Sequence, residues 1–338
     1  MKKLLYLLII LSFVFTSCEK LFMDEDPADN AVSNFESLWS DVNRKYSFFE
    51  YKMIDWDSIH NVYRPLVHDG MPNEDLFNVM FSMLGVLRDG HVNLWSPFNV
   101  SRYEAVFLNS PENYDGRLLQ DHYLGTDYMI TGSLAHKAIG TGENIGYIRY
   151  GSFMDPIAEE DIDYVIDRYR NKKGIIIDVR NNGGGAPDYA FLLASRFTNV
   201  KREVYISYVK NGPKHNDFSS ANSVCVEPGG SIQFTKPVMV LTNRGSYSAT
   251  NMFVAMMNAF PNVHLVGDTT GGGGGAPTYG ELPNGWGYRF SASKTILPNG
   301  FNIENGIPPN IAINMDPADE LNGMDSILER ALDEIENN

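Results

Sequence analysis

Two serines lie in one short polar turn, and their position suits nucleophilic chemistry. The turn Gly245-Ser-Tyr-Ser-Ala249 follows the apolar run from Val238 to Leu241 and precedes a helix-like stretch that ends near Phe260. A serine between a strand and a helix has an exposed hydroxyl beside unpaired N–H groups, which favour negative charge. That placement suits acyl transfer, but the residues themselves do not choose between Ser246 and Ser248. The alternative is that one serine only caps the helix.

A second turn, Asp178-Val-Arg-Asn-Asn-Gly-Gly-Gly185, is rich in glycine and also joins an expected strand to an expected helix. Consecutive glycines allow positive φ and let backbone N–H groups approach an anion. A phosphate is a poor candidate, because the turn has neither a P-loop Lys-Ser/Thr pair nor dinucleotide glycine spacing. The turn therefore indicates an oxyanion site, with a turn needed only for packing as the alternative.

A nucleophilic serine needs a base, and the base needs an orienting group. Of the seven histidines, His91 stands out because it follows an expected helix end at Arg88-Asp-Gly, with Gly90 in the place of a helix-terminating glycine. Among the acids, Glu304 lies in a turn-rich stretch of residues 301–309. The sequence has no H-E-x-x-H motif and no Cys/His cluster, so we expect no catalytic metal and no cofactor.

Composition limits the classes of protein to consider. The chain has 338 residues, 43% of them hydrophobic, which is enough for a large core. Its net charge of −15 argues against nucleic acid as a partner. We expect Cys225 to be a buried thiol rather than a nucleophile, because its neighbours resemble a strand.

The N-terminus has the pattern of an export signal. Two lysines precede an apolar run from Leu4 to Phe15, which predicts a signal peptide over residues 1–17. The run ends in Phe15-Thr-Ser-Cys18, which resembles the lipobox of bacterial lipoproteins and implies a lipidated Cys18 on a polar tether, residues 18–30. We therefore expect membrane attachment through lipid on Cys18, on an exported lipoprotein of a bacterial cell envelope (periplasm-facing or outer membrane). The alternative is an ordinary signal peptide with an incidental cysteine.

Hydrophobic periodicity divides the rest of the chain into four parts. Residues 31–91 are expected to be helical, and residues 92–143 to form a small β-rich connector with strand-like runs at 103–108 and 128–130. Residues 144–316 alternate strands with helices, which predicts βαβ units and a largely parallel sheet, with residues 286–296 as one late strand. Residues 317–338 are expected to hold a terminal helix.

Taken together, these segments resemble the C-terminal-processing and tricorn-type serine peptidases (tail-specific protease-like). The resemblance covers about residues 74–316. Besides the two turns, it is carried by Gly146-Tyr-Ile-Arg149, Val266-Gly-Asp268, Pro298-Asn-Gly300 and Gly306-Ile-Pro-Pro-Asn310. It implies an α/β fold, with a crotonase-like or ClpP-like spiral core after a helical N-terminal segment. Many members insert a PDZ module, but only residues 92–143 are available here, so we expect none.

The resemblance also assigns roles to residues. The second serine of the turn, Ser248, is implied as the nucleophile. The processing branch uses a later lysine as base, but this sequence has Gly273 at that position. The tricorn branch instead implies His91 as base and Glu304 as the late acid, with Lys294 as a weaker alternative base.

The resulting hypothesis is a serine peptidase that hydrolyses peptide bonds in a peptide or protein substrate. Backbone N–H groups at Gly183 or Gly184, together with that of Ala249, would hold the oxyanion. One alternative is a catalytically silent, peptide- or lipid-binding lipoprotein on the same fold. A serine esterase is another, although the turn is not G-x-S-x-G. The oligomeric state is left open.

Overall fold

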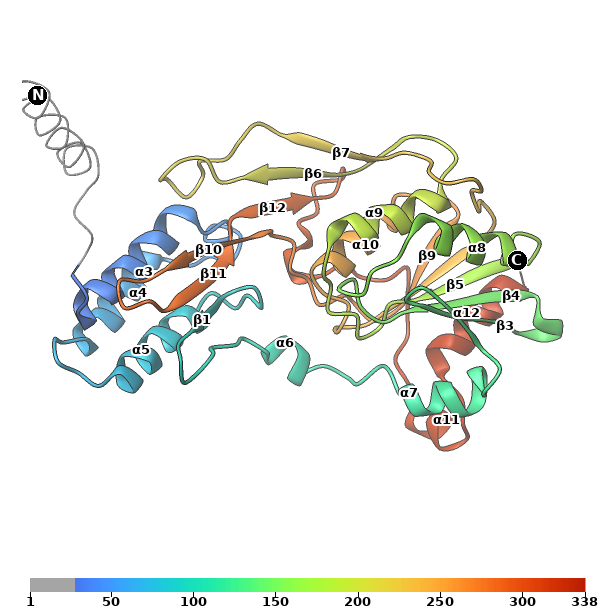
Figure 1. Cartoon of the computed structure of the whole chain (residues 1–338), viewed down its shortest axis with the longest axis horizontal. Helices are drawn as coiled ribbons and strands as arrows, with labels where there is room; N and C mark the ends of the chain where they lie inside the picture. Colours follow the sequence, from blue (N-terminus) through green and yellow to red (C-terminus); the bar gives the residue numbers. More distant parts are fainter. Residues whose placement is uncertain (1–27, 338) are drawn as a thin grey trace, which may run out of the picture.

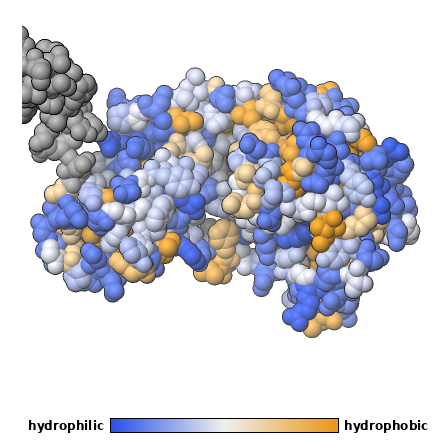
Figure 2. Space-filling view, in the orientation of Figure 1, coloured by the Kyte–Doolittle hydropathy of each residue, from blue (hydrophilic) through white to orange (hydrophobic). Residues whose placement is uncertain are grey.

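The computed structural model describes residues 28–337. The predicted signal peptide, Cys18 and all but the last three residues of the predicted tether lie outside the described residues. The described part has two lobes: an N-terminal helical lobe, blue in Figure 1, and a lobe built on a large sheet. On the face shown in Figure 2, hydrophilic side chains predominate and hydrophobic groups interrupt them over the sheet lobe.

The large sheet has seven strands in the order β13-β9-β8-β5-β4-β3-β2. The first five of these run parallel, and β3 and β2 are antiparallel additions at one edge. The central strands are continuous apolar runs buried on both faces, as expected when helices cover both sides. The predicted largely parallel sheet is therefore confirmed. The strands are β2 (Met129–Thr131), β3 (Leu134–Ile139), β4 (Ile145–Tyr150), β5 (Gly174–Asp178), β8 (Val238–Thr242), β9 (Val263–Gly267) and β13 (Ile311–Ala312).

Helices cover both faces of this sheet, and alternate residues of β5 show how. Ile175 and Ile177 pack in a core with helices α8 (Glu159–Tyr169), α9 (Pro187–Ala194) and α10 (Ala249–Asn258). Ile176 points to the opposite face and packs against the terminal helix α12 (Ser326–Glu336). Short helices α7 (Gly116–Leu119) and α11 (Pro317–Leu321) lie near α12 in Figure 1.

The N-terminal lobe combines segments from both ends of the chain. Its helices are α3 (Ala31–Lys45), α4 (Trp56–Tyr63) and α5 (Asn73–Gly85). They pack on a three-stranded sheet in the order β1 (Asn93–Trp95), β11 (Gly287–Ser291), β10 (Pro277–Glu281). One core joins Phe35 and Phe77 of the helices to Tyr288 and Phe290 of β11. Residues 277–291, expected within the catalytic core, therefore complete the hydrophobic core of the N-terminal lobe.

The prediction of one strand over residues 286–296 is wrong, because the chain changes sheet within it. After β11, Ala292 donates its N–H to Ala276 and accepts from Lys210. The next strand, β12 (Ser293–Ile296), belongs to a separate sheet in the order β12, β6 (Arg202–Val209), β7 (Asn222–Val226), which runs along the top of Figure 1. Apolar alternation continues across such a switch, so the pattern hides it.

Two other sequence predictions are wrong at the level of local structure. Residues 103–108, expected to be strand-like, contain the short helix α6 (Ala105–Leu108). Helix α5 ends at Gly85, well before the expected end, and the positive φ in the following loop belongs to Arg88 (48°). Gly90 is needed for space instead, because a Cβ there would lie 2.8 Å from the Tyr247 hydroxyl.

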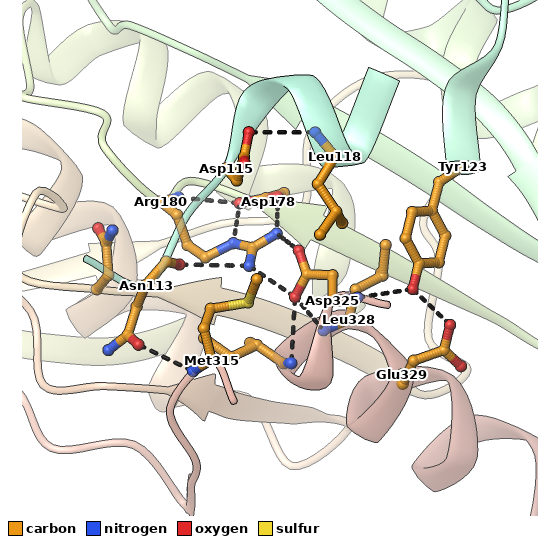
Figure 3. Close-up of polar contacts among 12 residues, drawn as sticks. Asn113, Asp115, Leu118, Tyr123, Asp178, Arg180, Met315, Asp325, Leu328 and Glu329 are labelled. Atoms are coloured by element: carbon orange, nitrogen blue, oxygen red, sulfur yellow. Dashed lines mark hydrogen bonds and ion pairs between the residues drawn. The ribbon is translucent and has the colours of Figure 1, made fainter. Parts of the chain in front are cut away.

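A buried ion network fixes the base of the glycine turn to the terminal helix (Figure 3). The Arg180 guanidinium donates to both carboxylate oxygens of Asp178, at 3.0 and 2.7 Å, and to Asp325 at 3.0 Å. Asp325 also caps α12 by accepting two backbone N–H groups. All three side chains are fully buried. Charge-assisted hydrogen bonds therefore fix the start of the glycine turn, at Arg180, to the end of β5 and to the first turn of α12.

Candidate active site

Ser248 occupies a strained elbow between β8 and α10. Its φ of 59° and ψ of −120° are rare for a residue with a side chain, and such strain clusters at functional sites. The elbow is fixed by two backbone hydrogen bonds, from Ser248 N to Gly272 O and from Tyr247 N to Asn182 O. The Ser248 side chain makes no capping bond to α10, so the helix-cap alternative does not describe this serine.

Ser246 has a different environment. Its hydroxyl is fully buried, donates to Val179 O at 2.8 Å and accepts from Asn243 N at 3.2 Å. The bond from Asn243 closes the polar turn, and the bond to Val179 attaches the turn to the end of β5. The structure thus separates two serines that the local sequence left equivalent: Ser246 is a structural hydroxyl, and Ser248 lines a cavity.

The structure brings His91 to Ser248 from 157 residues away in the sequence. His91 Nε2 lies 2.9 Å from Ser248 Oγ. The loop that carries the imidazole is held by Asp89, whose carboxylate accepts the His91 backbone N–H at 2.8 Å and the Ser291 hydroxyl at 2.8 Å. Asp89 therefore fixes the His91 backbone to strand β11.

The surroundings of His91 favour its neutral form. Burial lowers the pKa of the imidazole, and the charges of Arg289 and Lys52 lower it further. The Asp89 carboxylate and the Gly275 backbone oppose this shift. Nδ1 nevertheless has no hydrogen bond of normal geometry within residues 28–337. A neutral imidazole beside a hydroxyl is the protonation state that a general base requires.

Glu304 lies deep in the protein but does not bond to His91. Its Oε1 accepts from Lys52 Nζ at 2.7 Å, with both side chains nearly fully buried, and its Oε2 accepts from Gly274 N at 3.0 Å. Burial raises the pKa of Glu304 to about 8 and the charge of Asp89 adds to the rise, while Lys52 and Gly274 oppose it. No hydrogen bond joins Glu304 to the imidazole in the part of the chain that the structure describes.

Lys52 connects Glu304 to the histidine loop. Besides the carboxylate, its ammonium donates to Leu87 O at 3.1 Å and to Arg88 O at 3.0 Å. The Leu87 and Arg88 carbonyls lie four and three residues before His91, respectively. The acid therefore reaches the base only indirectly, through one buried cation and the backbone of the loop.

The three predicted oxyanion donors are not equivalent. The Gly184 N–H donates to Asn182 Oδ1 at 3.0 Å, so it is already engaged. Within the described range, the N–H groups of Gly183 and Ala249 donate to no protein acceptor. Gly184 is needed for close packing, since a Cβ there would lie 2.8 Å from both Ala249 N and Ser248 Cβ. Gly183 and Ala249 are the donors that remain available to an anion.

Neither lysine position offers a base. Gly273, which replaces the lysine of the processing branch, has φ +76° and its Cβ would lie 2.6 Å from the Tyr247 ring. Lys294, the weaker alternative base, lies on β12 with its ammonium 3.9 Å from the centre of the Phe218 ring. Lys294 is not among the residues that line the cavity around Ser248, so the structure does not bring it to the site.

Ser248 and His91 line a cavity of about 1020 Å³ between the two lobes. The sheet lobe contributes Gly183, Gly184 and Ala249, and the N-terminal lobe contributes side chains of β1, β10 and β11, among them Arg289. Within residues 28–337, no group of three or more His, Cys, Asp or Glu side chains could hold a metal ion. The arrangement provides a serine, a histidine and two free N–H groups in one cavity.

Sequence reasoning missed four residues around this site: Lys52, Asp89, Tyr247 and Arg289. Asp89 and Tyr247 lie inside motifs that were already singled out, so their neighbours could have pointed to them. Lys52 lies in the turn between α3 and α4, and Arg289 lies on β11; neither belongs to a motif. Their importance depends on long-range contacts that no local pattern encodes.

A strained serine that is hydrogen-bonded to histidine, beside free backbone N–H groups, is the arrangement of the serine hydrolases. The sequence profile described as Peptidase family S41 matches residues 144–313. The profile described as Tricorn protease C1 domain matches residues 27–85. Because the first match covers half of the chain, the chain belongs to peptidase family S41, and the predicted resemblance is confirmed.

Two curated relatives come from Bacillus subtilis (strain 168). Carboxy-terminal processing protease CtpA is 31% identical over 171 residues, which is 50% of this chain and 34% of CtpA. Carboxy-terminal processing protease CtpB is 29% identical over 175 residues, or 51% of this chain and 34% of CtpB. The matched part therefore spans about a third of the length of these relatives.

Solved structures confirm the predicted fold class. A crystal structure of a protein from Parabacteroides merdae is 41% identical, with a TM-score of 0.88 over 91% of this chain and 97% of that chain. Mature CPAF complexed with lactacystin has a TM-score of 0.69 at 14% identity, covering 91% of this chain and 99% of its own. The tricorn protease has a TM-score of 0.57 at 19% identity, covering 91% of this chain and 36% of its own. The last two show a shared fold alone.

Proposed function

We propose that this chain is a serine peptidase that hydrolyses peptide bonds through an acyl-enzyme on Ser248. The observation that carries the proposal is the 2.9 Å contact between His91 Nε2 and Ser248 Oγ at a strained elbow. Family membership and the names of the B. subtilis relatives support peptide bonds as the target.

In the proposed mechanism, His91 takes the Ser248 proton as the hydroxyl attacks the scissile carbonyl, and then gives it to the leaving amine. The N–H groups of Gly183 and Ala249 hold the negative charge of the tetrahedral intermediate. Removing one such donor costs about 3 kcal/mol of barrier in related chemistry. A water molecule, activated by the same imidazole, then releases the acyl group.

The acid component is divided between two carboxylates. Asp89 holds the His91 backbone, and its charge favours the imidazolium that forms during attack. Glu304, predicted as the orienting acid, serves as a positioning residue, because it acts through Lys52 on the carbonyls of Leu87 and Arg88. This division follows from the missing hydrogen bond between Glu304 and the imidazole.

The test is labelling with a fluorophosphonate probe, followed by identification of the labelled peptide. We expect labelling at Ser248 that is lost in Ser248→Ala and strongly reduced in His91→Ala. Ser152→Ala is a matched control, because Ser152 lines the same cavity without contacting His91. Folded wild-type protein that resists the probe and cleaves no peptide would instead favour the silent binding protein.

We also propose that the protein is an exported lipoprotein, anchored by lipid on Cys18. The apolar run and the Thr-Ser-Cys18 sequence support this proposal. The described residues include no helix long and apolar enough to cross a membrane. Mass spectrometry of the N-terminal peptide from the membrane fraction tests the proposal. A diacylated Cys18 is expected, and Cys18→Ala should move the protein out of that fraction.

A further inference from the structure

One guanidinium in the catalytic cavity is held in place without a carboxylate partner. Arg289 lies on β11 and lines the same cavity as His91 and Ser248. Its Nε donates to Asn93 Oδ1 at 2.7 Å, and Asn93 in turn donates to Ser101 O at 2.9 Å. Within residues 28–337, its two Nη groups make no hydrogen bond or ion pair. The hydrogen bond at Nε therefore orients the guanidinium, while the two Nη groups remain free to bind both oxygens of a carboxylate.

The setting of Arg289 differs from that of the other arginine in the cavity. Arg102 is 66% exposed and pairs with Glu104 at 4.0 Å, as expected of a surface ion pair. Arg289 is partly buried and unpaired, although acidic side chains outnumber basic ones in this chain, 42 to 27. An unpaired, oriented cation in the cavity that Ser248 also lines leaves a binding position for an anion.

Strand register defines the surface around the guanidinium. Asn93 of β1 and Tyr279 of β10 lie directly opposite Arg289, one on each side, so all three side chains project from one face of the sheet. Tyr279 is 63% exposed, and its ring centre lies 6.4 Å from that of Trp95. Arg289 is thus the central cation of a partly aromatic strip of this sheet, and the strip lines the same cavity as Ser248.

Arg289 also opposes the reaction when it is unoccupied. Its charge lowers the pKa of His91 and so disfavours the imidazolium that must form during attack. An anion bound at Arg289 would offset that effect. A substrate that brings its own negative charge would therefore both bind and relieve this cost.

We propose that Arg289 binds a carboxylate of the peptide substrate, so that the cavity selects peptides with a negative charge near the scissile bond. This inference rests on the proposed function. The carboxylate has two sources, the free C-terminus of the peptide or an Asp or Glu side chain, and both present the same planar pair of oxygens to the guanidinium.

Binding to the Ser248→Ala protein tests the inference without requiring turnover. Three fluorescent hexapeptides of alanine and leucine are compared by anisotropy: one with a free C-terminal carboxylate, one with a C-terminal amide, and one amide with an internal glutamate. We expect at least one carboxylate peptide to bind about tenfold or more tightly than the neutral amide. The peptide that gains affinity identifies the source.

Variants then assign the preference to one side chain. Adding Arg289→Gln should lower the affinity for the carboxylate peptide to that for the amide, so that the ratio between them falls to about one. Arg289→Lys keeps the positive charge but not the planar pair of donors, so this variant should retain part of the preference for the carboxylate peptide. Arg102→Gln is the matched control and should keep the full ratio. Equal binding of all three peptides by the parent protein, or a ratio that survives Arg289→Gln, overturns the inference.

Failure of the inference and failure of the proposed function remain distinguishable. If wild-type protein is labelled at Ser248 but the peptides bind equally, only the carboxylate preference is wrong. If the carboxylate preference depends on Arg289 but no labelling or cleavage occurs, the protein binds such peptides without hydrolysing them.

Discussion

The proposed nucleophile and the proposed base are held in place by two different kinds of contact. Ser248 lies in the sheet lobe, where the elbow is closed by backbone hydrogen bonds to Asn182 and Gly272. His91 lies on a loop of the N-terminal lobe, which depends on a buried ion pair between Lys52 and Glu304, 252 residues apart in the sequence. The first arrangement belongs to a continuous parallel sheet, whereas the second requires both lobes to be assembled.

This difference teaches that the two halves of the site can fail separately. Damage to the elbow removes the nucleophile itself. Damage to the Lys52 contacts leaves Ser248 in its strained conformation but frees the loop that presents the imidazole. Predictions that break one half while sparing the other therefore test the comparison directly.

The largest effect is expected from the two residues where the halves meet. Ser248→Ala and His91→Ala should each lower kcat on a cleaved peptide by up to about a millionfold, and the double variant should be no worse, because the pair acts as a unit. Steady-state and single-turnover kinetics measure this. Lys294→Ala should be as active as wild type. Near-normal turnover in His91→Ala, with loss in Lys294→Ala, would show that the base was assigned to the wrong residue.

The next largest effect is expected from a variant that disturbs the histidine loop but spares the Ser248 elbow. At a pH above 8, where Glu304 is ionised, Lys52→Met leaves a buried carboxylate without its partner and should lower the free energy of unfolding by about 3–5 kcal/mol. Adding Glu304→Gln should recover much of that loss, but not activity, since the Leu87 and Arg88 carbonyls still lack their donor. Denaturant unfolding and kcat measure the two outcomes.

The matched control lies in the other lobe. Asp325→Asn weakens the buried pair with Arg180 and should also destabilise the protein, yet the fraction that stays folded should react normally with the fluorophosphonate. Equal loss of reactivity per folded molecule in Lys52→Met and Asp325→Asn would contradict a specific role for the lysine.

The sequence predicted the sheet lobe better than the N-terminal lobe, for the same physical reason. In the sheet lobe, buried strands, glycine turns and helices follow one another along the chain, so local patterns suffice. In the N-terminal lobe, residues 277–291 return to pack on helices from residues 31–85, and no local pattern indicates this return. The strand switch at Ala292 was missed because apolar alternation runs through it.

The residues of the site also divide into those that local sequence indicated and those that depend on long-range contacts. The serine turn, the glycine turn and His91 as a candidate base were found from their residues, and the choice of Ser248 over Ser246 came from family resemblance. The indirect position of Glu304 could not be predicted, because it depends on Lys52 reaching a carboxylate across the interface between lobes. The engagement of Gly184 by Asn182 depends on a side-chain rotamer that the sequence does not specify.

A smaller effect tests the two glycines of the oxyanion turn. Gly184→Ala introduces a Cβ at positive φ within 2.8 Å of the elbow, so it should lower kcat about a hundredfold to a thousandfold by displacing Ser248 and Ala249. Gly183→Ala places its methyl group in open space and should have a much smaller effect. Kinetics on one peptide, with circular dichroism to confirm folding, compare them. The reverse order would mean that the elbow does not depend on close packing at Gly184.

The smallest effect, a shift along the pH axis, distinguishes the contributions of the two lobes to the base. Because the pKa of His91 is lowered from 6.5, the imidazole stays neutral down to lower pH, and kcat/KM should fall only as pH drops below that value. Removing the Arg289 charge with Arg289→Gln should move this limb to higher pH, and removing the Asp89 charge with Asp89→Asn should move it lower. A limb near pH 8 in wild type would instead show that Glu304 must be ionised for turnover.

Stability should report Glu304 independently of activity. Its folded pKa of about 8 exceeds the ordinary value of 4.5, so the folded protein holds a proton that the unfolded chain releases between these values. This contribution is fully present below pH 4.5 and is lost as pH rises toward 8, so the unfolding free energy of wild type should decline across that window. Glu304→Gln should remove that decline, as measured by denaturant unfolding at several pH values. An unchanged slope in the variant would mean that the Lys52 ammonium keeps Glu304 ionised throughout, and the carboxylate would then remain a charged partner for the histidine loop at every pH where the enzyme works.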